Sequence, residues 1–204
     1  MNIQGKRVLL RAIEEKDLEL LHKWANDPYI NTMVGGWHFP TNMKDQRKWF
    51  ESLSVSSPNQ RFAIETEELG LIGTANLVDI NWKDKNAHHG MLLGDKDIRG
   101  KGYAVDTIIT IMRYAFEELG LNRLDGSIIE YNEASYGVYV KKCGWKDEGV
   151  LREWYYRNNK FWDKKIVGVT KIAKTIIQRI PPIGFGNRDI KRYQHHNAII
   201  VPVT

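Results

Sequence analysis

The chain has almost no cysteine and no long apolar run, and each scarcity excludes a class of protein. Cys143 is the one cysteine among 204 residues, so neither an intramolecular disulfide nor a cysteine-built zinc site can form. The longest apolar stretches, such as residues 198–201, fall far short of the roughly 18 residues that a membrane-spanning helix needs. The first residues hold no apolar signal core. We therefore expect a soluble, cytoplasmic protein that does not engage a membrane.

The positive charge of the chain is confined to its end. The net charge is +5, and six basic residues against one acidic residue follow Thr170, so the whole surplus lies beyond that point. The basic residues are widely spaced with few aromatics among them, which is unlike a nucleic-acid-binding surface. We predict one domain over residues 1–170 and a basic C-terminal extension over residues 171–204. The apolar residues 199–201 favour docking of this extension on the body or on a second subunit, giving a homodimer.

Apolar periodicity predicts an α/β (α+β) fold with a mixed sheet. Residues 102–119 form the longest helical pattern, with an apolar face broad enough to lie on a sheet. Residues 31–40 are expected to form a loop, and Thr41 to cap the helix that follows it. The other expected helices are residues 14–25, 41–53 and 135–142. The expected strands are residues 7–13, 61–65, 71–80, 87–93, 123–129, 147–157 and 161–170.

A glycine-rich segment opens the long helix and predicts an anion site. It reads Arg99-Gly100-Lys101-Gly102-Tyr103-Ala104 and follows a strand. The first amides of a helix have no partner within it, and glycine lets the backbone approach a phosphate without a clash at Cβ. The spacing fits neither a Walker loop nor a dinucleotide fingerprint. The alternative is a tight turn that merely tolerates glycine.

A second polar motif follows the strand 123–129. Asn132 stands at the strand end, where its amide can both donate to and accept from a ligand. Ser135 can contact a ligand or cap the next helix. Tyr139 lies one helical turn after Ser135 on the same face, where its phenol can donate a proton or simply fill the core.

Together the two motifs make the chain resemble the GNAT N-acetyltransferases, in the RimJ/RimL-like branch. The family's acetyl-CoA motif, Q/R-x-x-G-x-G/A, matches Arg99 to Ala104 at every fixed position. The resemblance covers roughly residues 6–170. It implies a mostly antiparallel twisted sheet with helices on both faces and a splayed central strand pair. It also implies acetyl-CoA as cosubstrate and no metal.

The resemblance further implies roles for individual residues. The coenzyme would lie along a splayed strand and on the glycine-rich loop, a strand amide near Leu92 would polarise the acetyl carbonyl, and Tyr139 would protonate the leaving thiolate. The coenzyme-binding residues it implies are Leu92, Leu93, Gly94, Arg99, Gly100, Lys101, Gly102, Tyr103, Ala104, Val105, Asn132 and Ser135. One spacing departs from the family, since Gly144 follows Tyr139 by five residues rather than four. Either the extra residue bulges the helix end, or it turns the helix and Tyr136 takes the role of Tyr139.

The acceptor amine needs a base, because an amine with a pKa of about 10 is protonated at neutral pH. His88 and His89 are adjacent on a strand, so their side chains point to opposite faces and at most one meets the substrate. His88 stands where RimL-like proteins often carry glutamate, so it is the candidate base, with a histidine that only bonds within the sheet as the alternative. Divergent histidines give no metal site.

Substrate selectivity in this branch is expected from the loop after the first helix and from the last hairpin. Trp37, His38 and Tyr155 are the candidate acceptor-binding residues. The leading expectation is acetyl transfer to a small primary amine, such as an amino-sugar nucleotide, by direct attack in a ternary complex. Protein N-terminal acetylation and non-catalytic acyl-CoA binding are the alternatives.

Overall fold

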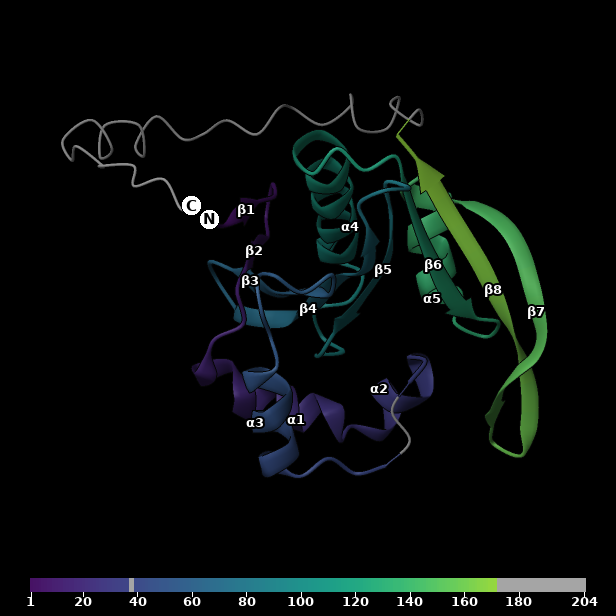
Figure 1. Cartoon of the computed structure of the whole chain (residues 1–204). Coiled ribbons are helices and arrows are strands. Elements are labelled where there is room, and N and C mark those ends of the chain that lie inside the picture. Colours follow the sequence, from purple (N-terminus) through teal and green to yellow (C-terminus); the bar gives the residue numbers. More distant parts are fainter. Residues whose placement is uncertain (37–38, 172–204) are drawn as a thin grey trace.

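The computed structural model describes residues 1–36 and 39–171 and shows one twisted sheet with helices on both of its faces (Figure 1). The eight strands lie in the order β1-β2-β3-β4-β5-β6-β8-β7. The strands are β1 (Ile3–Gln4), β2 (Leu9–Arg11), β3 (Gln60–Thr66), β4 (Gly70–Asn81), β5 (Asn86–Leu93), β6 (Arg123–Ile129), β7 (Lys146–Arg157) and β8 (Lys160–Thr170). The α/β fold expected from the sequence is therefore confirmed, with mostly antiparallel pairing.

The helices differ from the expected ones at two places. The α-helices are α1 (Leu18–Ala25), α2 (Pro28–Met33), α3 (Met43–Glu51), α4 (Tyr103–Arg113) and α5 (Glu133–Tyr136), with a 3₁₀ turn η1 (Glu15–Asp17) and wide π-helical turns η2 (Tyr114–Glu118) and η3 (Gly137–Lys142). The expected loop 31–40 was wrong at its start, because Pro28 begins α2 and the Asp27 side chain caps it by accepting from the Ile30 amide. The cap of α3 is Asn42 and not Thr41.

The central strand pair is splayed. β5 and β6 are the parallel pair, and they are paired only at Asn86–Arg123, Ala87–Leu124 and His88–Asp125. Beyond His88 the strand β5 continues to Leu93 along β4, while β6 continues along β8. A gap between β5 and β6 therefore opens at His88 and Asp125, as the resemblance implied.

The two faces of the sheet are covered differently. The long helix α4 packs on one face, over a large buried cluster drawn from β2 to β6, β8 and the turn at Trp145. Helices α1, α2 and α3 cover part of the other face with a smaller cluster around Trp24 and Ala63. Strand β7 is exposed along most of its length, so the β7–β8 hairpin extends past both helical layers.

The described residues end at Lys171, at the edge of this domain. The Lys171 amide donates to the Asn122 carbonyl at 2.8 Å. The predicted extension 171–204 and its docking, apart from Lys171 itself, lie outside the described residues. Within residues 1–36 and 39–171, every helix is too short or too polar to cross a bilayer.

Candidate active site

The gap between β5 and β6 presents free backbone groups of β5. The Gly94 amide donates to the Ile72 carbonyl of the neighbouring stretch of β4, and the Gly90 amide donates to the Asn76 side chain, also on β4. Because successive residues of a strand direct their amides to opposite sides, the amides of Met91 and Leu93 point into the gap. The sequence placed the carbonyl-polarising amide near Leu92, whose own amide points to β4. Met91 was missed because the direction of an amide follows from pairing that the sequence does not reveal.

The glycine-rich loop lies at the start of α4 in the conformation that an anion site needs. Gly100 and Gly102 have φ angles of 76° and 89°, which favour glycine, and Gly102 is the N-cap residue of α4. No side chain caps this helix, so the first amides, from Tyr103 to Val105, are open. A Cβ on Gly100 would meet nothing within 4 Å. The space beside Gly100 is therefore open, which the approach of a phosphate group requires.

Basic and aromatic side chains hold this loop in place. The Arg7 guanidinium donates to the Lys101 carbonyl at 2.5 Å and lies over the buried Tyr103 ring. The side chains of Lys96 and Arg99 both lie over the ring of Tyr29 in α2, with the cationic groups about equally far from the ring centre, at 4.6 and 4.5 Å. The loop thus carries several cations, which suits a ligand with more than one phosphate.

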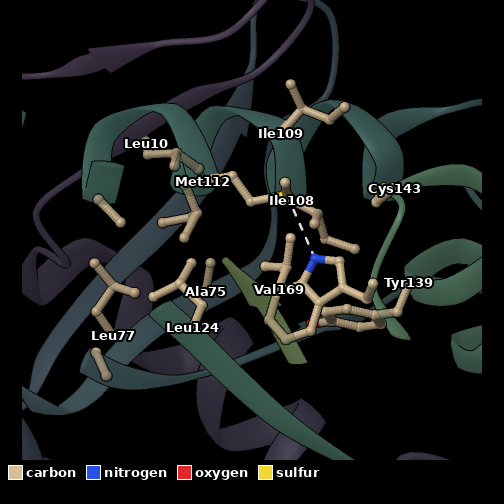
Figure 2. Packing of buried hydrophobic residues seen from close by; sticks show 14 of the residues in the cluster. Leu10, Ala75, Leu77, Ile108, Ile109, Met112, Leu124, Tyr139, Cys143 and Val169 are labelled. Atoms are coloured by element: carbon tan, nitrogen blue, oxygen red, sulfur yellow. Dashed lines mark hydrogen bonds between the residues drawn. The ribbon is translucent and has the colours of Figure 1, made fainter. Parts of the chain in front are cut away.

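Tyr139 lies on the α4 side of the gap, within the buried cluster beside Cys143 (Figure 2). Its ring packs edge-on against Trp145 at 4.9 Å between centroids and lies 5.8 Å from the His89 ring. The Trp145 indole donates to the Met112 sulfur of α4, the dashed line in Figure 2. Burial raises the pKa of Tyr139 well above its usual value, so the phenol stays protonated at neutral pH. Its hydroxyl makes no hydrogen bond within the described chain, which leaves the proton available to a ligand.

The extra residue between Tyr139 and Gly144 is taken up by the wide turn η3. The Cys143 amide donates to the Val138 carbonyl, five residues back, instead of the four of an α-helix. The bulge expected as one of two outcomes is therefore present. Tyr136, the alternative acid, points elsewhere, because its hydroxyl donates to the Asp147 carboxylate of β7 at 2.7 Å. That hydrogen bond raises the pKa of Tyr136.

Asn132 caps α5 in this structure. Its side-chain oxygen accepts from the Ser135 amide at 3.1 Å, and its nitrogen donates to the Met33 carbonyl of α2 at 3.0 Å. Ser135 is therefore the residue whose amide is capped, and the capping role considered for its own side chain was wrong. Asn132 ties α2 to the end of β6 at the mouth of the gap.

His88 and His89 lie on opposite faces, as strand alternation predicted. The His89 ring is buried on the α4 face, where its Nδ1 donates to the Asn76 carbonyl at 2.7 Å, and burial lowers its pKa to about 4. His88 is one-third exposed on the other face, with Nδ1 2.9 Å from the Asp125 carboxylate of β6. A bond through Nδ1 leaves Nε2 as the nitrogen that can take a proton. Asp125, missed in the sequence, faces His88 because the two residues form the last pair before the gap opens.

A groove of about 740 Å³ opens on the His88 face of the sheet. The residues that line it are Gly35, Gly36, Ser127, Trp154, Tyr155, Tyr156, Arg157 and Lys164. Tyr155, an expected acceptor-binding residue, is among them, and a Cβ on Gly35 would approach its hydroxyl to 2.9 Å. The other two, Trp37 and His38, lie outside the described residues. The groove therefore lies between the residues that follow α2 and the β7–β8 hairpin.

Three predicted coenzyme-binding residues at the end of β5 and just after it have different surroundings. Leu93 packs against the cluster under α4, and Leu92 against the cluster under α1 and α3. A Cβ on Gly94 would overlap the indole of Trp24, so glycine is needed there for packing.

Cys143 is buried, which raises its pKa to about 12 and makes it a poor nucleophile. Among residues 1–36 and 39–171 no group of three or more His, Cys, Asp or Glu side chains is arranged to hold a metal ion.

Comparison with known proteins agrees with this geometry. Residues 7–146 match the acetyltransferase (GNAT) domain family. The chain is 31% identical to a probable N-acetyltransferase from Bacillus subtilis, over 82% of this chain and 96% of that protein. It is 26% identical to a spermidine N(1)-acetyltransferase from Vibrio cholerae, over 79% of this chain and 91% of that protein.

Solved structures share the fold of this chain. The crystal structure of the Vibrio cholerae spermidine N-acetyltransferase in complex with CoA and spermine superposes with a TM-score of 0.75. It covers 82% of this chain and 98% of that one at 23% identity. A GNAT-family acetyltransferase from Bacillus anthracis superposes with a TM-score of 0.70 at 23% identity, over 83% and 98% of the two chains. With the splayed strands, the open glycine-rich loop and the family match in agreement, the chain belongs to the GNAT acetyltransferases and is an N-acetyltransferase that uses acetyl-CoA.

Proposed function

We propose that this protein transfers the acetyl group of acetyl-CoA to the primary amine of a small molecule, by direct attack in a ternary complex. The observation that carries the proposal is the gap between β5 and β6, with the buried phenol of Tyr139 on one face and the exposed imidazole of His88 on the other. A proton donor and a proton acceptor on opposite sides of one opening suit a reaction in which the amine loses a proton and the thiolate gains one.

Each residue has a definite task in this proposal. Nε2 of His88 accepts the proton of the incoming ammonium, directly or through a water, while Asp125 holds the ring through Nδ1. The amides of Met91 and Leu93 point into the gap, where they can donate to the carbonyl oxygen as negative charge develops on it. Tyr139 gives its proton to the departing sulfur. The loop from Gly100 to Val105 binds the pyrophosphate and thereby fixes the thioester at the gap.

The acceptor is proposed from the site and from its relatives. A relative and a structural neighbour act on spermidine, which supports a small amine as acceptor. Within that class we propose an amino-sugar nucleotide, and we place the chain in the RimJ/RimL-like branch. Protein N-termini are the alternative acceptor. The homodimer, the docking of residues 171–204 and the cytoplasmic location also stay predictions.

The test of the coenzyme site uses two glycines at opposite ends of one helical segment. Gly102 precedes α4 and Gly120 follows η2, both with positive φ and with no backbone near a new Cβ. Valine at either position strains the backbone by a similar amount, of the order of 1–2 kcal/mol. We expect Gly102→Val to weaken acetyl-CoA binding about 100-fold, because it blocks phosphate approach to amides whose charged hydrogen bonds contribute about 1.5–3 kcal/mol each. Gly120→Val should leave that affinity unchanged, as measured by titration calorimetry.

An unchanged acetyl-CoA affinity in Gly102→Val would contradict the proposed site. Coenzyme A release should then be followed across a panel of amino-sugar nucleotides, N-terminal peptides, polyamines and aminoglycosides. Tight acetyl-CoA binding without release on any acceptor would favour the non-catalytic alternative. Release with one class of amine would identify the acceptor class.

A further inference from the structure

The groove on the His88 face carries unpaired positive charge. Arg157 Nη1 donates to the Tyr156 carbonyl, whereas Arg157 Nη2 is buried and has no partner within the described chain. Lys164 Nζ lies 4.6 Å from the centre of the Trp154 ring and belongs to none of the ion pairs of residues 1–36 and 39–171. A buried guanidinium nitrogen without an acceptor is costly, so a negatively charged ligand would offset that cost.

Among the described residues of the groove lining, no carboxylate balances these two cations. The described residues that line it include Arg157 and Lys164 but neither aspartate nor glutamate. Glu153 and Asp163 line a neighbouring hollow that shares Trp154, and the Asp163 carboxylate there accepts from the Glu153 amide. A site for a polyamine needs negative charge, so this groove has the opposite sign from the one such a substrate requires.

The groove opens on the same face of the sheet as the proposed base, His88. Ser127 lines the groove and lies two residues after Asp125 on β6, on the same face, which is a step of about 7 Å along the strand. The intervening Gly126 faces the other side, where a Cβ would approach the Trp145 ring. Lys164 of β8 lies on the same face, because it is paired with Ile129 of β6, two residues from the Ile166–Ser127 pair. An amine at His88 can therefore extend past Ser127 towards Lys164 and Arg157.

We propose that the acceptor amine carries an anionic group, a phosphate or a carboxylate, that binds Arg157 and Lys164 in this groove. The inference rests on the proposed function, since it places the amine of that acceptor at His88. The rings of Trp154, Tyr155 and Tyr156 add flat apolar walls, which suit a sugar or a planar ring between the amine and the anion.

The experiment compares amines in matched pairs that differ only in the anion. One arm uses 6-aminohexyl phosphate against 6-aminohexanol, and the other uses a tripeptide against its C-terminal amide, so phosphate and carboxylate are distinguished. Both anions can then reach past the step of about 7 Å from Asp125 to Ser127. Binding is measured by calorimetry on the full chain saturated with coenzyme A, and kcat/KM is measured by coenzyme A release. We expect the anionic member of at least one pair to bind at least about 10-fold more tightly, in line with a charge-assisted hydrogen bond.

Variants assign the preference to the groove. Lys164→Gln and Arg157→Gln should each reduce the anionic-to-neutral ratio about 10-fold, and Lys164→Glu should shift the preference towards spermidine. Lys160→Gln is the matched control, because Lys160 lies on the same hairpin with its ammonium over the Trp162 ring and outside the groove. The control should leave the ratio unchanged, and melting temperatures should show that every variant folds.

Three outcomes overturn the inference. The first is equal binding of the anionic and neutral members in both pairs. The second is an equal change of the anionic-to-neutral ratio in Lys164→Gln and Lys160→Gln. The third is tighter binding of spermidine than of any other amine by the wild-type chain. Binding is measured without turnover, so it tests the groove separately from the reaction. If the proposed function fails and the groove inference holds, the chain will bind the anionic amine selectively but release no coenzyme A.

Discussion

Adjacent histidines on β5 show how differently the two faces of one sheet treat the same side chain. His89 lies on the α4 face, is 1% exposed and has a pKa lowered to about 4 by burial. His88 lies on the other face, is one-third exposed and is held by a carboxylate 2.9 Å away. On the α4 face the loss of water lowers the pKa of His89, whereas on the other face the Asp125 carboxylate holds the His88 ring in place.

This contrast separates the two halves of the proposed chemistry. The dry face keeps a phenol protonated until a leaving thiolate arrives, and it excludes water from the thioester. On the open face a hydrated amine can enter, and His88 is the proposed acceptor of its proton. Variants on each face can test whether the proton donor and the proton acceptor act separately.

The largest expected effect is on the dry face. Tyr139→Phe removes a hydroxyl that makes no hydrogen bond within the described chain, so the melting temperature should hardly change. Turnover should fall by about 100-fold or more, the range of a lost general acid, while acetyl-CoA affinity stays near that of the wild-type protein. Tyr136→Phe is the control, since its hydroxyl binds Asp147 instead. Normal turnover in Tyr139→Phe together with loss in Tyr136→Phe would move the acid to Tyr136.

The second prediction concerns stability in acid. His89 is neutral in the folded protein down to about pH 4, whereas in the unfolded chain it takes up a proton below its ordinary value of 6.5. The unfolded state therefore binds more protons between these limits, and the free energy of unfolding should drop by about 3 kcal/mol as pH falls through this window. His89→Gln should remove that part of the slope in denaturant titrations at several pH values, and His88→Gln should retain it. An equal slope in wild type and His89→Gln would show that other groups cause the acid sensitivity.

The smallest expected effect is on the open face. Asp125→Asn keeps an oxygen near His88 Nδ1 but removes the negative charge that stabilises a protonated ring, so kcat should fall about 10-fold. His88→Gln should make Asp125→Asn nearly silent, because the carboxylate acts through the imidazole. A double-mutant cycle on kcat, with acetyl-CoA affinity as the reference, measures this coupling. Additive losses would mean that Asp125 has a role apart from His88.

Sequence patterns predicted the strands well, because each strand carries its own alternation. The expected strand 123–129 is β6 itself, and the expected strand 87–93 begins one residue late. Short elements were harder. Helix α2 was missed, because its six residues show little periodicity, although Pro28 suits a first helical turn, and the two-residue strand β1 has no periodicity to detect.

The site divides in the same way between local and distant information. The glycine-rich turn before α4 and the wide turn after Tyr139 could be expected from the sequence, because each depends on consecutive residues. Asp125 and Ser127 could not, since their meeting with His88 and with the β7–β8 hairpin depends on a parallel register across more than thirty residues of intervening chain. A lone aspartate in a strand gives no sign of the residue it will face.

The wide turn η3 has a consequence for comparing this protein with its relatives. In an α-helix one extra residue would rotate everything after it by about 100°, yet here Trp145 still reaches Met112 beneath α4. The wide turn from Gly137 to Lys142 accommodates the extra residue locally. When this chain is aligned with its relatives, the extra residue therefore belongs in the turn after Tyr139, where the hydrogen bonds accommodate it. A gap placed before Tyr139 would pair this tyrosine with a different residue of the relative.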